Sequence, residues 1–501
     1  MHIYTSHLKK LIVLLCVIIG YNITYAQPLK RELRAAWIAT VANIDWPSSK
    51  TLSSTEQKEQ FILRLDKLKN IGCNTVIVQV RPSCDACYPS SKEPWCQYLT
   101  GTQGSPPIPY YDPLEFMIEE THKRNMEFHA WFNPFRALVN CKANPNPSNH
   151  VTKKHKDWII NYGDKAYLDP GIPEVRDYVN DVIMDVVKRY DIDAIHLDDY
   201  FYPYRIGKIN FGDKKSYLKY GKGIDKDTWR RENVNKFIKE LSVDMKKEKP
   251  YLKFGISPFG VWRNKSKDTL QGSETRAGQT CYDDLYADVI TWLKNGWIDY
   301  LMPQLYWSHK NKAASFTVLL PWWQSHCYNR QIFYGLGAYQ VSNSKSDFDL
   351  NELLQQIKDI RKNTKNTGFS FYSAISLDKL GKPIKDSLNN SYTKYPAFPP
   401  VMNWIDSIPP NAPVLKLTEN KKENNLHWEE YNPKNEPIKY AVYRFLQNEE
   451  VNIERTDRII SLQQSTTYID NDIKSCKHCT YIVTALDRLW NESKPSNKVQ
   501  Q

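Results

Sequence analysis

Eight short segments rich in β-branched and aromatic residues recur between residues 33 and 374, and this repetition constrains the fold more than any other feature of the sequence. The segments are 33–40, 74–80, 127–133, 194–199, 253–257, 299–306, 331–338 and 368–374. Stretches with helical periodicity or long loops separate them. Eight strands that alternate with helices predict an α/β fold, a closed (β/α)8 barrel of the TIM type with a parallel sheet.

The segments between the expected strands carry the signs of helices. Residues 55–71 place their apolar side chains on one stripe, and Ser54 with Gln57 has the spacing of a capping box. Segments 113–124 and 173–190 begin with proline, which suits the first helical turn. Further helices are expected at 233–246, 283–295 and 350–363. No glycine-rich phosphate loop follows any expected strand, which argues against an open nucleotide-binding sheet.

The loops after the second to fifth strands are long and rich in Pro, Trp, Tyr, Arg and Asn. They span 81–112, 134–157, 200–228 and 258–282. Loops of this length in a compact domain are usually functional. Because ligands of such barrels bind at the carboxyl ends of the strands, we expect these loops to build a cleft there.

Two further regions flank the expected barrel, which we place at residues 27–405. Residues 1–26 carry Lys9 and Lys10, then an apolar run and small residues, which is the pattern of a secretory signal peptide. That pattern predicts an exported protein of the periplasm or cell surface without a transmembrane span. Beyond proline-rich linkers, residues 411–501 show short alternating segments, with Trp428 and Tyr481 placed as in a small all-β sandwich like fibronectin type III.

The charge and the cysteine content limit the classes of binding partner and cofactor that we expect. The formal net charge is +12, but the lysines are scattered without an arginine-rich stripe, so we expect no nucleic-acid partner. A solvated lysine-rich face explains the charge most simply, and a basic surface would also suit an acidic glycan. The pairs Cys84–Cys87 and Cys476–Cys479 lack histidines at zinc-site spacing, so local disulfides or free thiols are expected. No metal site, cofactor motif or serine-hydrolase elbow is visible, and the oligomeric state stays open.

The fourth expected strand ends in two adjacent carboxylates, Asp198 and Asp199. Alternation along a strand places His196 and Asp198 on one face and Asp199 on the other. If the apolar face packs against helices, Asp198 points inward at the ligand-binding end of the barrel. The alternative is a pair of aspartates that cap a helix or a turn. We expect Asp198 to be catalytic.

Three other expected strands carry polar residues near their ends in the same way. These are Gln79 and Arg81, His129 and Asn133, and Gln304 and Tyr306. Buried polar groups without partners cost about 1–3 kcal/mol each, so the repetition favours a ligand site. A structural polar network inside the barrel is the alternative for His196 and Gln79.

Hydrolysis of a glycosidic bond needs an acid that protonates the leaving oxygen and a second carboxylate that acts as base or nucleophile. Asp198 is our first candidate, and Asp199 would join it only if the chain twists after the strand. Glu93 and Asp85 lie on the long second loop, and Asp45 follows the first strand. Each of these acids has a structural alternative, as a cap or in a salt bridge with Arg81, Arg136 or Arg263.

Several motifs, in order, resemble one known family. They are LRAAWIAT with NIDWP at 33–47, QVRP and EPW at 79–95, HAWFNPFR at 129–136, DDYFYPY at 198–204, WRRENVN at 229–235, GISPFGVWRN at 255–264 and YLMPQLYW at 300–307. Over about residues 30–400 the chain resembles glycosyl-hydrolase-like barrels that include cell-division-associated peptidoglycan glycosidases. The resemblance implies an enzyme that cleaves glycan strands of the cell wall, best after the stem peptides are removed.

The motifs are also similar to α-amylase-type barrels, whose nucleophile stands at the position of Asp198. The amylase comparison does not identify the catalytic acid of this chain, because Ser257 and Pro258 stand where an amylase has its acidic glutamate. A second difference is that His196 replaces the amylase arginine. Retention or inversion of configuration therefore stays open, with Asp199 or Glu93 as the partner of Asp198. The substrate would contact Asp45, Arg81, Asp85, His129, Asn133, Arg136, His196, Tyr202, Arg263, Gln304, Tyr306 and Trp307. A hydrolase of another polysaccharide and a non-catalytic glycan-binding barrel are the alternatives.

Overall fold

The larger part of the molecule is a closed parallel barrel. The computed structural model describes residues 29–142, 147–349, 351–363, 368–419, 423–429, 438–472 and 478–501, so the expected signal peptide lies outside the described residues. The barrel strands are β1 (Leu33–Ile38), β2 (Thr75–Arg81), β3 (Glu127–Phe132), β7 (Ala194–Leu197), β8 (Lys253–Ile256), β9 (Tyr300–Leu301) with β10 (Gln304–Leu305), β11 (Gln331–Leu336) and β12 (Gly368–Phe371). They pair in chain order, and β12 pairs with β1 to close the sheet. The predicted (β/α)8 barrel is confirmed.

Each of the eight expected segments overlaps a barrel strand, and two of the differences in extent have consequences for the site. The sixth segment is split into β9 and β10, because Pro303 between them has no N–H for the ladder. The fourth segment forms a strand only to Leu197, so Asp198 and Asp199 lie beyond its end. This early end changes the position of both carboxylates.

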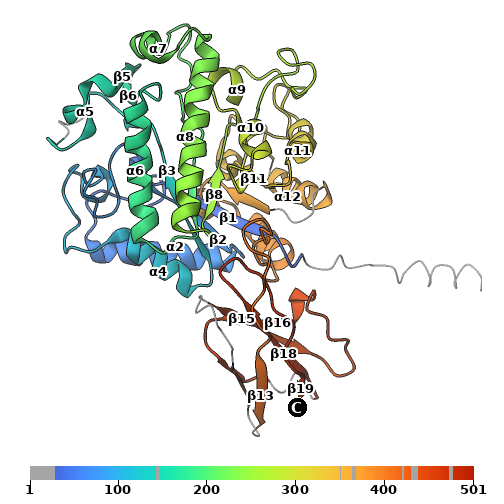
Figure 1. The fold of residues 1–501 in the computed structure, drawn as a ribbon. Coiled ribbons are helices and arrows are strands. Elements are labelled where there is room, and N and C mark those ends of the chain that lie inside the picture. Colours follow the sequence, from blue (N-terminus) through green and yellow to red (C-terminus); the bar gives the residue numbers. More distant parts are fainter. Residues whose placement is uncertain are drawn as a thin grey trace, which may run out of the picture.

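Helices cover the outside of the barrel (Figure 1). The larger ones are α2 (Ser54–Asn70), α4 (Pro113–Lys123), α6 (Pro173–Arg189), α8 (Lys226–Glu248), α11 (Phe316–Ser325) and α12 (Glu352–Asn363). Helix α11 was not expected from the sequence, and the segment 283–295 forms two shorter helices, α9 (Cys281–Asp284) and α10 (Val289–Lys294). The capping box of α2 is built by Ser53 and Glu56, one residue before the expected pair Ser54 and Gln57.

Two hydrophobic layers hold the barrel together. The outer layer joins the sheet to the helices and includes Phe61, Val78, Phe128, Ile183 and Trp292. The inner layer fills the barrel and includes Ala35, Trp37, Ile77, Trp131, Tyr300 and Met302. Both faces of every strand are therefore buried, which explains why these segments read as nearly continuous apolar runs.

The long loops add small elements at the carboxyl ends of the strands. A three-stranded antiparallel sheet of β4 (Arg136–Leu138), β6 (Lys165–Leu168) and β5 (Ile159–Tyr162) follows β3, with α5 (Val151–Lys154) between β4 and β5. Helix α7 (Lys214–Tyr220) follows β7. Helix α3 (Gln97–Thr100) lies in the loop after β2, and α13 (Ala374–Asp378) and α14 (Lys382–Ser387) follow β12. In Figure 1 α5, α7 and this small sheet stand at the end of the barrel that is remote from the C-terminal module.

Residues after 413 form a separate all-β module of two antiparallel sheets. One sheet has the order β13 (Val414–Glu419), β14 (Asn424–Glu429) and β17 (Thr467–Asp470). The other has the order β16 (Ile459–Gln463), β15 (Lys439–Phe445), β18 (Thr480–Leu486) and β19 (Val499–Gln500). Strands β16 and β19 were not expected. Trp428 and Tyr481 are both in the module core, and the Tyr481 hydroxyl donates to Asp470 at 2.8 Å.

The module is docked on the amino-terminal end of the barrel through buried polar and aromatic contacts. Trp490 Nε1 donates to Oε1 of Glu127, the first residue of β3, at 2.7 Å. The Trp490 ring stacks on Phe398 of the linker with centroids 5.7 Å apart. Lys30, just before β1, pairs with Glu492 of the module at 2.5 Å. The linker is thus part of the barrel floor, and the module is fixed to the barrel.

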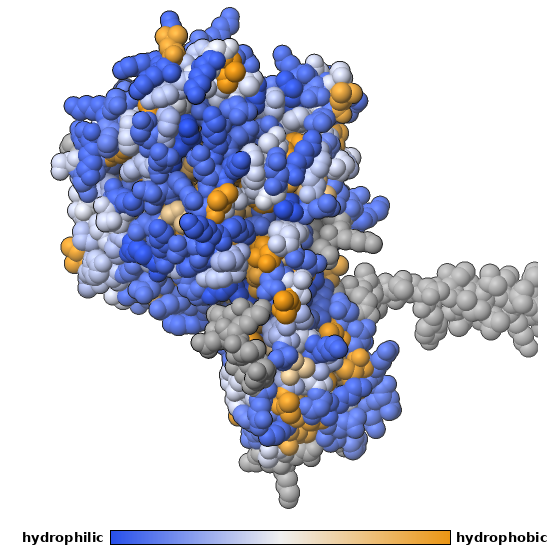
Figure 2. Space-filling model, viewed as in Figure 1, coloured by the Kyte–Doolittle hydropathy of each residue, from blue (hydrophilic) through white to orange (hydrophobic). Residues whose placement is uncertain are grey.

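The predicted cysteine pairs differ in their state, and the surface of the barrel is mainly polar. Cys84 and Cys87 are free buried thiols, whereas Cys479 is disulfide-bonded and Cys476 lies outside the described residues. Figure 2 shows a mainly hydrophilic barrel surface with scattered hydrophobic residues. Within the described part of the chain, every helix is too short or too polar to traverse a lipid bilayer.

The docking contact predicts that the barrel depends on the module for stability. Replacing Trp490 by Ala removes a large buried ring and should lower the free energy of unfolding by about 3–5 kcal/mol. Trp490→Phe keeps the stacking but loses the hydrogen bond to Glu127, and should cost about 1.5–3 kcal/mol. The measurement is urea unfolding followed by helical circular dichroism, which reports on the barrel.

Leu446→Ala, at an exposed position of the same module, is the control and should leave the unfolding midpoint in place. An unchanged helical midpoint in Trp490→Ala would mean that the barrel is stable without this contact.

Candidate active site

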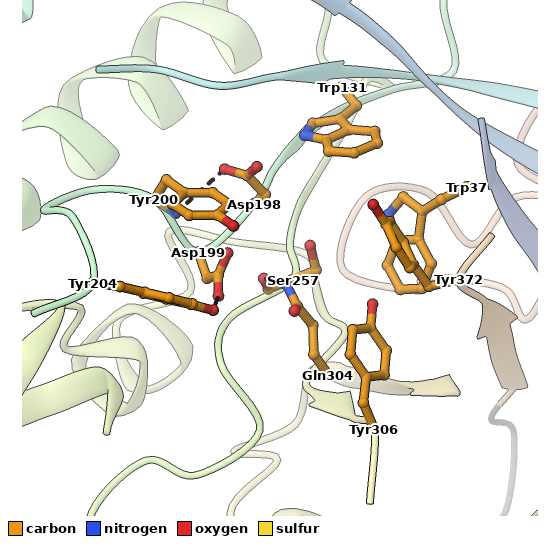
Figure 3. A pocket seen from close by; sticks show the side chains of 10 residues that line it. All are labelled: Trp37, Trp131, Asp198, Asp199, Tyr200, Tyr204, Ser257, Gln304, Tyr306 and Tyr372. Carbon is orange, nitrogen blue, oxygen red and sulfur yellow. Dashed lines mark hydrogen bonds between the residues drawn. The ribbon is translucent and has the colours of Figure 1, made fainter. Parts of the chain in front are cut away.

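A pocket of about 230 Å³ opens at the carboxyl ends of the barrel strands. It is lined by Trp37, Trp131, Asp198, Asp199, Tyr200, Tyr204, Ser257, Gln304, Tyr306 and Tyr372 (Figure 3). The lining combines two carboxylates with six aromatic side chains, one serine hydroxyl and one glutamine amide, which suits a polar ligand with apolar faces.

Both aspartates after β7 line the pocket, so the chain turns after the strand in the way that Asp199 needed to join Asp198. Strand alternation does not apply to them, because β7 ends at Leu197. Asp198 accepts hydrogen bonds from Asn133 Nδ2 and, at 3.3 Å, from the backbone N–H of Tyr200. Asp199 accepts a hydrogen bond from the Tyr204 hydroxyl. The turn after the strand therefore brings two adjacent carboxylates to one side of one pocket.

Burial makes both carboxylic acids weak. Removal from water raises the pKa of Asp198 to about 7, and the neighbouring charge of Asp199 contributes to the rise. Burial also raises the pKa of Asp199 to about 6, against the opposing hydrogen bond from Tyr204. Because the two groups titrate as a pair, the pair holds about one proton near neutral pH. One acid and one carboxylate are then present in the same pocket, as acid–base catalysis requires.

Aromatic side chains form the opposite wall of the pocket. Tyr372 packs against Trp37 and Tyr306, with ring centroids 6.1 and 5.7 Å apart. Tyr200 and Tyr204 pack against each other at 5.2 Å on the side of the aspartates. Figure 3 shows the two aspartates facing the Trp37–Tyr306–Tyr372 wall across the pocket. Such rings offer apolar faces that match the C–H faces of a sugar ring.

A buried polar network positions Ser257 at the floor of the pocket. Trp37 Nε1 can only donate, so His196 Nε2, 3.4 Å away, is an acceptor, and it also accepts from the Ser257 hydroxyl at 2.9 Å. Burial lowers the pKa of His196 well below its usual value, so its ring is neutral. His196 Nδ1 then donates to the Tyr300 hydroxyl at 2.9 Å. Ser257 consequently presents lone pairs to the pocket and can accept from a ligand.

Three other predicted residues support the lining from behind. Asn133, which binds Asp198, is held by Gln79 Nε2 at 2.5 Å. Arg136 lies over the Tyr200 ring at 5.4 Å and its charge favours the ionised form of both aspartates. Asp45 accepts from Ser373 Oγ at 2.8 Å and so holds the residue after Tyr372. These residues shape the site without lining it.

Glu93, proposed as a second catalytic acid, is placed away from the pocket. Arg81 donates to both Glu93 oxygens, at 2.7 and 2.5 Å, and both side chains are fully buried. Tyr178 donates to Glu93 as well, at 2.9 Å. Arg81 also binds the backbone oxygen of Asn133 at 2.6 Å, so this ion pair braces the loop after β2 against the end of β3. Its geometry is that of a structural ion pair, since none of its oxygens lines the pocket.

The remaining predicted residues also have partners outside the pocket. Asp85 accepts from Gln103 at 2.9 Å, and Arg263 pairs with Asp283 at 2.9 Å. Tyr202 packs between Phe211 and Tyr286, and Trp307 packs on Phe259. His129 bonds Glu127 and Tyr300 inside the barrel, at 2.9 and 2.8 Å. Of the predicted residues, only Asp198, Asp199, Gln304 and Tyr306 line the pocket.

Six lining residues were not predicted as site residues: Trp37, Trp131, Tyr200, Tyr204, Ser257 and Tyr372. Strand parity was a usable signal for two of them. Trp131 is paired across the sheet with Gln79 and His196, so it shares their inward face. Trp37 occupies the equivalent inward position in β1. Both were overlooked because an inward tryptophan is also what ordinary core packing produces.

Within the described ranges, no cluster of three or more His, Cys, Asp or Glu side chains is arranged to hold a metal ion. The chemistry that the pocket can supply is proton transfer by its two carboxyl groups.

Comparisons with known proteins show which family and which proteins this chain is similar to. Residues 32–351 match the model of a family described as Glycosyl hydrolase-like 10. The chain is 47% identical to "Glycosyl hydrolase YngK" of Bacillus subtilis, over 93% of each chain. It is 39% identical to "Glycosyl hydrolase DigH" of Escherichia coli K12, over 66% of this chain and 80% of that protein. The glycoside hydrolase domain of PgaB from Bordetella bronchiseptica matches 72% of this chain and 98% of that domain, at 10% identity and a TM-score of 0.44.

The raised pKa values predict that the carboxylate pair lowers stability at alkaline pH. A carboxyl group whose folded pKa exceeds its unfolded value of 3.8 favours folding below that value, and this contribution is lost as the pH rises through about 6 to about 7. Asp199→Asn should therefore raise the free energy of unfolding by roughly 2–3 kcal/mol at about pH 8 and by little at about pH 4. Urea unfolding at both pH values measures this difference.

Asp177→Asn, on the exposed face of α6, is the control and should show no pH-dependent gain. Equal stability changes for Asp199→Asn at the two pH values would contradict the assigned burial of charge.

Proposed function

The chain belongs to the Glycosyl hydrolase-like 10 family, and on that premise we propose that it is an exported glycoside hydrolase that cleaves peptidoglycan glycan strands. The preferred substrate in this proposal is a strand from which the stem peptides have been removed. The observation that carries the enzymatic part is the pair Asp198–Asp199, which shares one pocket with a wall of aromatic rings. A pair with about one proton contains the acid that a leaving glycosidic oxygen needs.

The substrate, the export of the protein and the type of the C-terminal module are each supported by a separate observation. The motifs between residues 33 and 307 resemble those of cell-division-associated peptidoglycan glycosidases, and this resemblance supports the substrate. The net charge of +12 suits an acidic glycan. The pattern of residues 1–26 supports export. The two antiparallel sheets after residue 413 support a fibronectin type III-like module.

Two alternatives use the same pocket. A hydrolase of another polysaccharide would keep the two carboxylates and differ in the sugars that the aromatic wall accepts. A non-catalytic glycan-binding barrel would bind sugar without bond cleavage. The raised pKa values of Asp198 and Asp199 favour an enzyme, because a binding site gains nothing from buried acids that hold a proton near neutral pH.

Digestion of purified glycan strands tests the proposal. Strands freed of stem peptides should give defined fragments by mass spectrometry, and Asp198→Asn and Asp199→Asn should each lower kcat by about 100- to 10,000-fold, since each removes one partner of the proton transfer. Asp177→Asn should keep wild-type activity. Intact sacculi that still carry stem peptides should be cleaved more slowly than peptide-free strands.

Wild-type rates from an Asp198→Asn and an Asp199→Asn variant would remove the pair from the mechanism. Binding without products on several glycans would favour the non-catalytic barrel.

The shared proton also predicts the pH dependence of the reaction. Activity should be highest between the two pKa values, about 6 and about 7, where one carboxyl is protonated and the other is ionised. It should fall at lower pH because both groups are protonated, and at higher pH because both are ionised. The bell-shaped profile is measured by determining kcat/KM from initial rates across a range of pH. A flat profile between about pH 5 and about pH 9 would contradict an acid–base pair.

A further inference from the structure

The pocket lacks a carboxylate on the side opposite the aspartate pair. Among its ten lining residues Asp198 and Asp199 are the only acids. Glu93, Asp85 and Asp45 are buried and bonded to other groups of the protein. Adjacent residues on one turn approach a bound sugar from one side. Ordinary retaining and inverting mechanisms place the second carboxylate on the face of the ring opposite the acid, where it attacks the anomeric carbon or activates water.

An acetamido sugar supplies the missing nucleophile. We propose, building on the function proposed above, that the carbonyl oxygen of the substrate's own 2-acetamido group attacks the anomeric carbon. One member of the Asp198–Asp199 pair protonates the leaving oxygen, and the other accepts the acetamide N–H and holds that group in place. The site then takes N-acetylated sugars in β linkage, because the attacking oxygen and the leaving oxygen must lie on opposite faces of the ring.

The shape of the pocket suits an acetamido group. Trp37, Tyr306 and Tyr372 form an aromatic corner that can cover the apolar methyl group. In Figure 3 this corner faces the two aspartates, so a group between them meets rings on one side and carboxylates on the other. An acetamide has that same division, with a methyl group at one end and a polar N–H at the other.

Trp131 provides a donor that the protein itself leaves unused. Its side chain is 6% exposed and its Nε1 has no hydrogen-bond partner. The indole N–H lies close enough to Asp198 to oppose the rise that burial causes in the pKa of that group. A buried N–H without a partner costs free energy, and a ligand oxygen in the pocket would satisfy it. The sugar hydroxyls and the leaving oxygen are acceptors of the required kind.

The electrons and protons balance over two steps. First, the acetamide oxygen forms a bond to the anomeric carbon, the bond to the leaving oxygen breaks, and that oxygen takes its electron pair and the proton of the acid. The product is a cyclic oxazoline whose N–H proton is accepted by the second carboxylate. Next, the deprotonated acid removes a proton from water, which attacks the anomeric carbon. The carbon–oxygen bond of the oxazoline breaks and the acetamide is restored with its N–H. The configuration of the anomeric carbon is retained.

The test varies the nucleophilicity of the acyl group and keeps its size nearly constant. Peptide-free strands are N-deacetylated and then re-acylated with acetyl, fluoroacetyl, difluoroacetyl or trifluoroacetyl groups. Each fluorine withdraws electrons from the carbonyl oxygen, so kcat of the full-length protein should fall at every step, by more than about tenfold over the series. NMR of fresh products should show a retained anomeric configuration. The exposed-site variant Asp177→Asn should show the same gradient as wild type.

The outcomes separate this inference from the function on which it rests. Products with equal kcat across the acyl series, or with inverted configuration, overturn acetamide participation and leave the glycosidase intact. An absence of products from native and re-acetylated strands refutes the glycosidase and the inference together. The falling series with retention supports both.

The two variants then assign the roles within the pair. An N-acetylated disaccharide with a dinitrophenyl leaving group needs no acid, so the variant that lacks the acid should release dinitrophenol at a rate close to wild type in its first turnover. The variant that lacks the acetamide-holding carboxylate should stay slow. Rapid first turnover in both Asp198→Asn and Asp199→Asn would exclude a carboxylate that holds the acetamide.

Discussion

The burial of two neighbouring carboxyl groups at the end of β7 is the interaction on which the site depends. Charged groups taken out of water are costly unless they are paired or protonated, and this pair uses both means. Asn133, the Tyr200 backbone and Tyr204 donate to the aspartates, and Arg136 adds a positive charge. The remaining cost of burying two charges raises the pKa of both aspartates. As a result, the pair destabilises the fold at alkaline pH, where both groups are ionised, and it holds a transferable proton near neutral pH.

The same hydrogen-bonding logic runs through the interior of the barrel. Glu127 binds His129, His129 binds Tyr300, Tyr300 binds His196, and His196 binds Ser257 in the pocket. Burial alone would raise the pKa of Glu127, but Lys253 and His129 outweigh it and lower that pKa to about 2. The chain of bonds therefore begins at a permanently ionised acceptor, and every member has a defined donor or acceptor role. His196 thus takes part in a structural network, which was one of its two predicted roles, and that network ends at Ser257 in the pocket.

Much of the fold was accessible from the sequence, because strand composition and helical period are local properties. All eight expected segments overlap a barrel strand, and only β2 extends beyond its segment, by the one residue Arg81. The position of Asp199 was not accessible, since it depends on where β7 ends, and one residue decides the face of a side chain. Glu93 looked available as a loop acid, yet Arg81 and Tyr178 bind it through contacts that only the closed barrel creates. Tyr372 comes from the last strand and meets Trp37 from the first, a proximity that closure of the sheet produces.

The contacts between the floor of the barrel and the C-terminal module restrict how the two domains can be exchanged during evolution. Glu127 receives Trp490 from the module and Lys253 from β8, and Lys30 reaches Glu492 across the junction. A sandwich of different sequence joined to the same linker would leave the ionised Glu127 without Trp490, and Lys30 without Glu492. Exchange of such modules between proteins would therefore be restricted to modules that carry the matching tryptophan and glutamate. Barrel and sandwich behave as one heritable unit, although they look like two interchangeable parts.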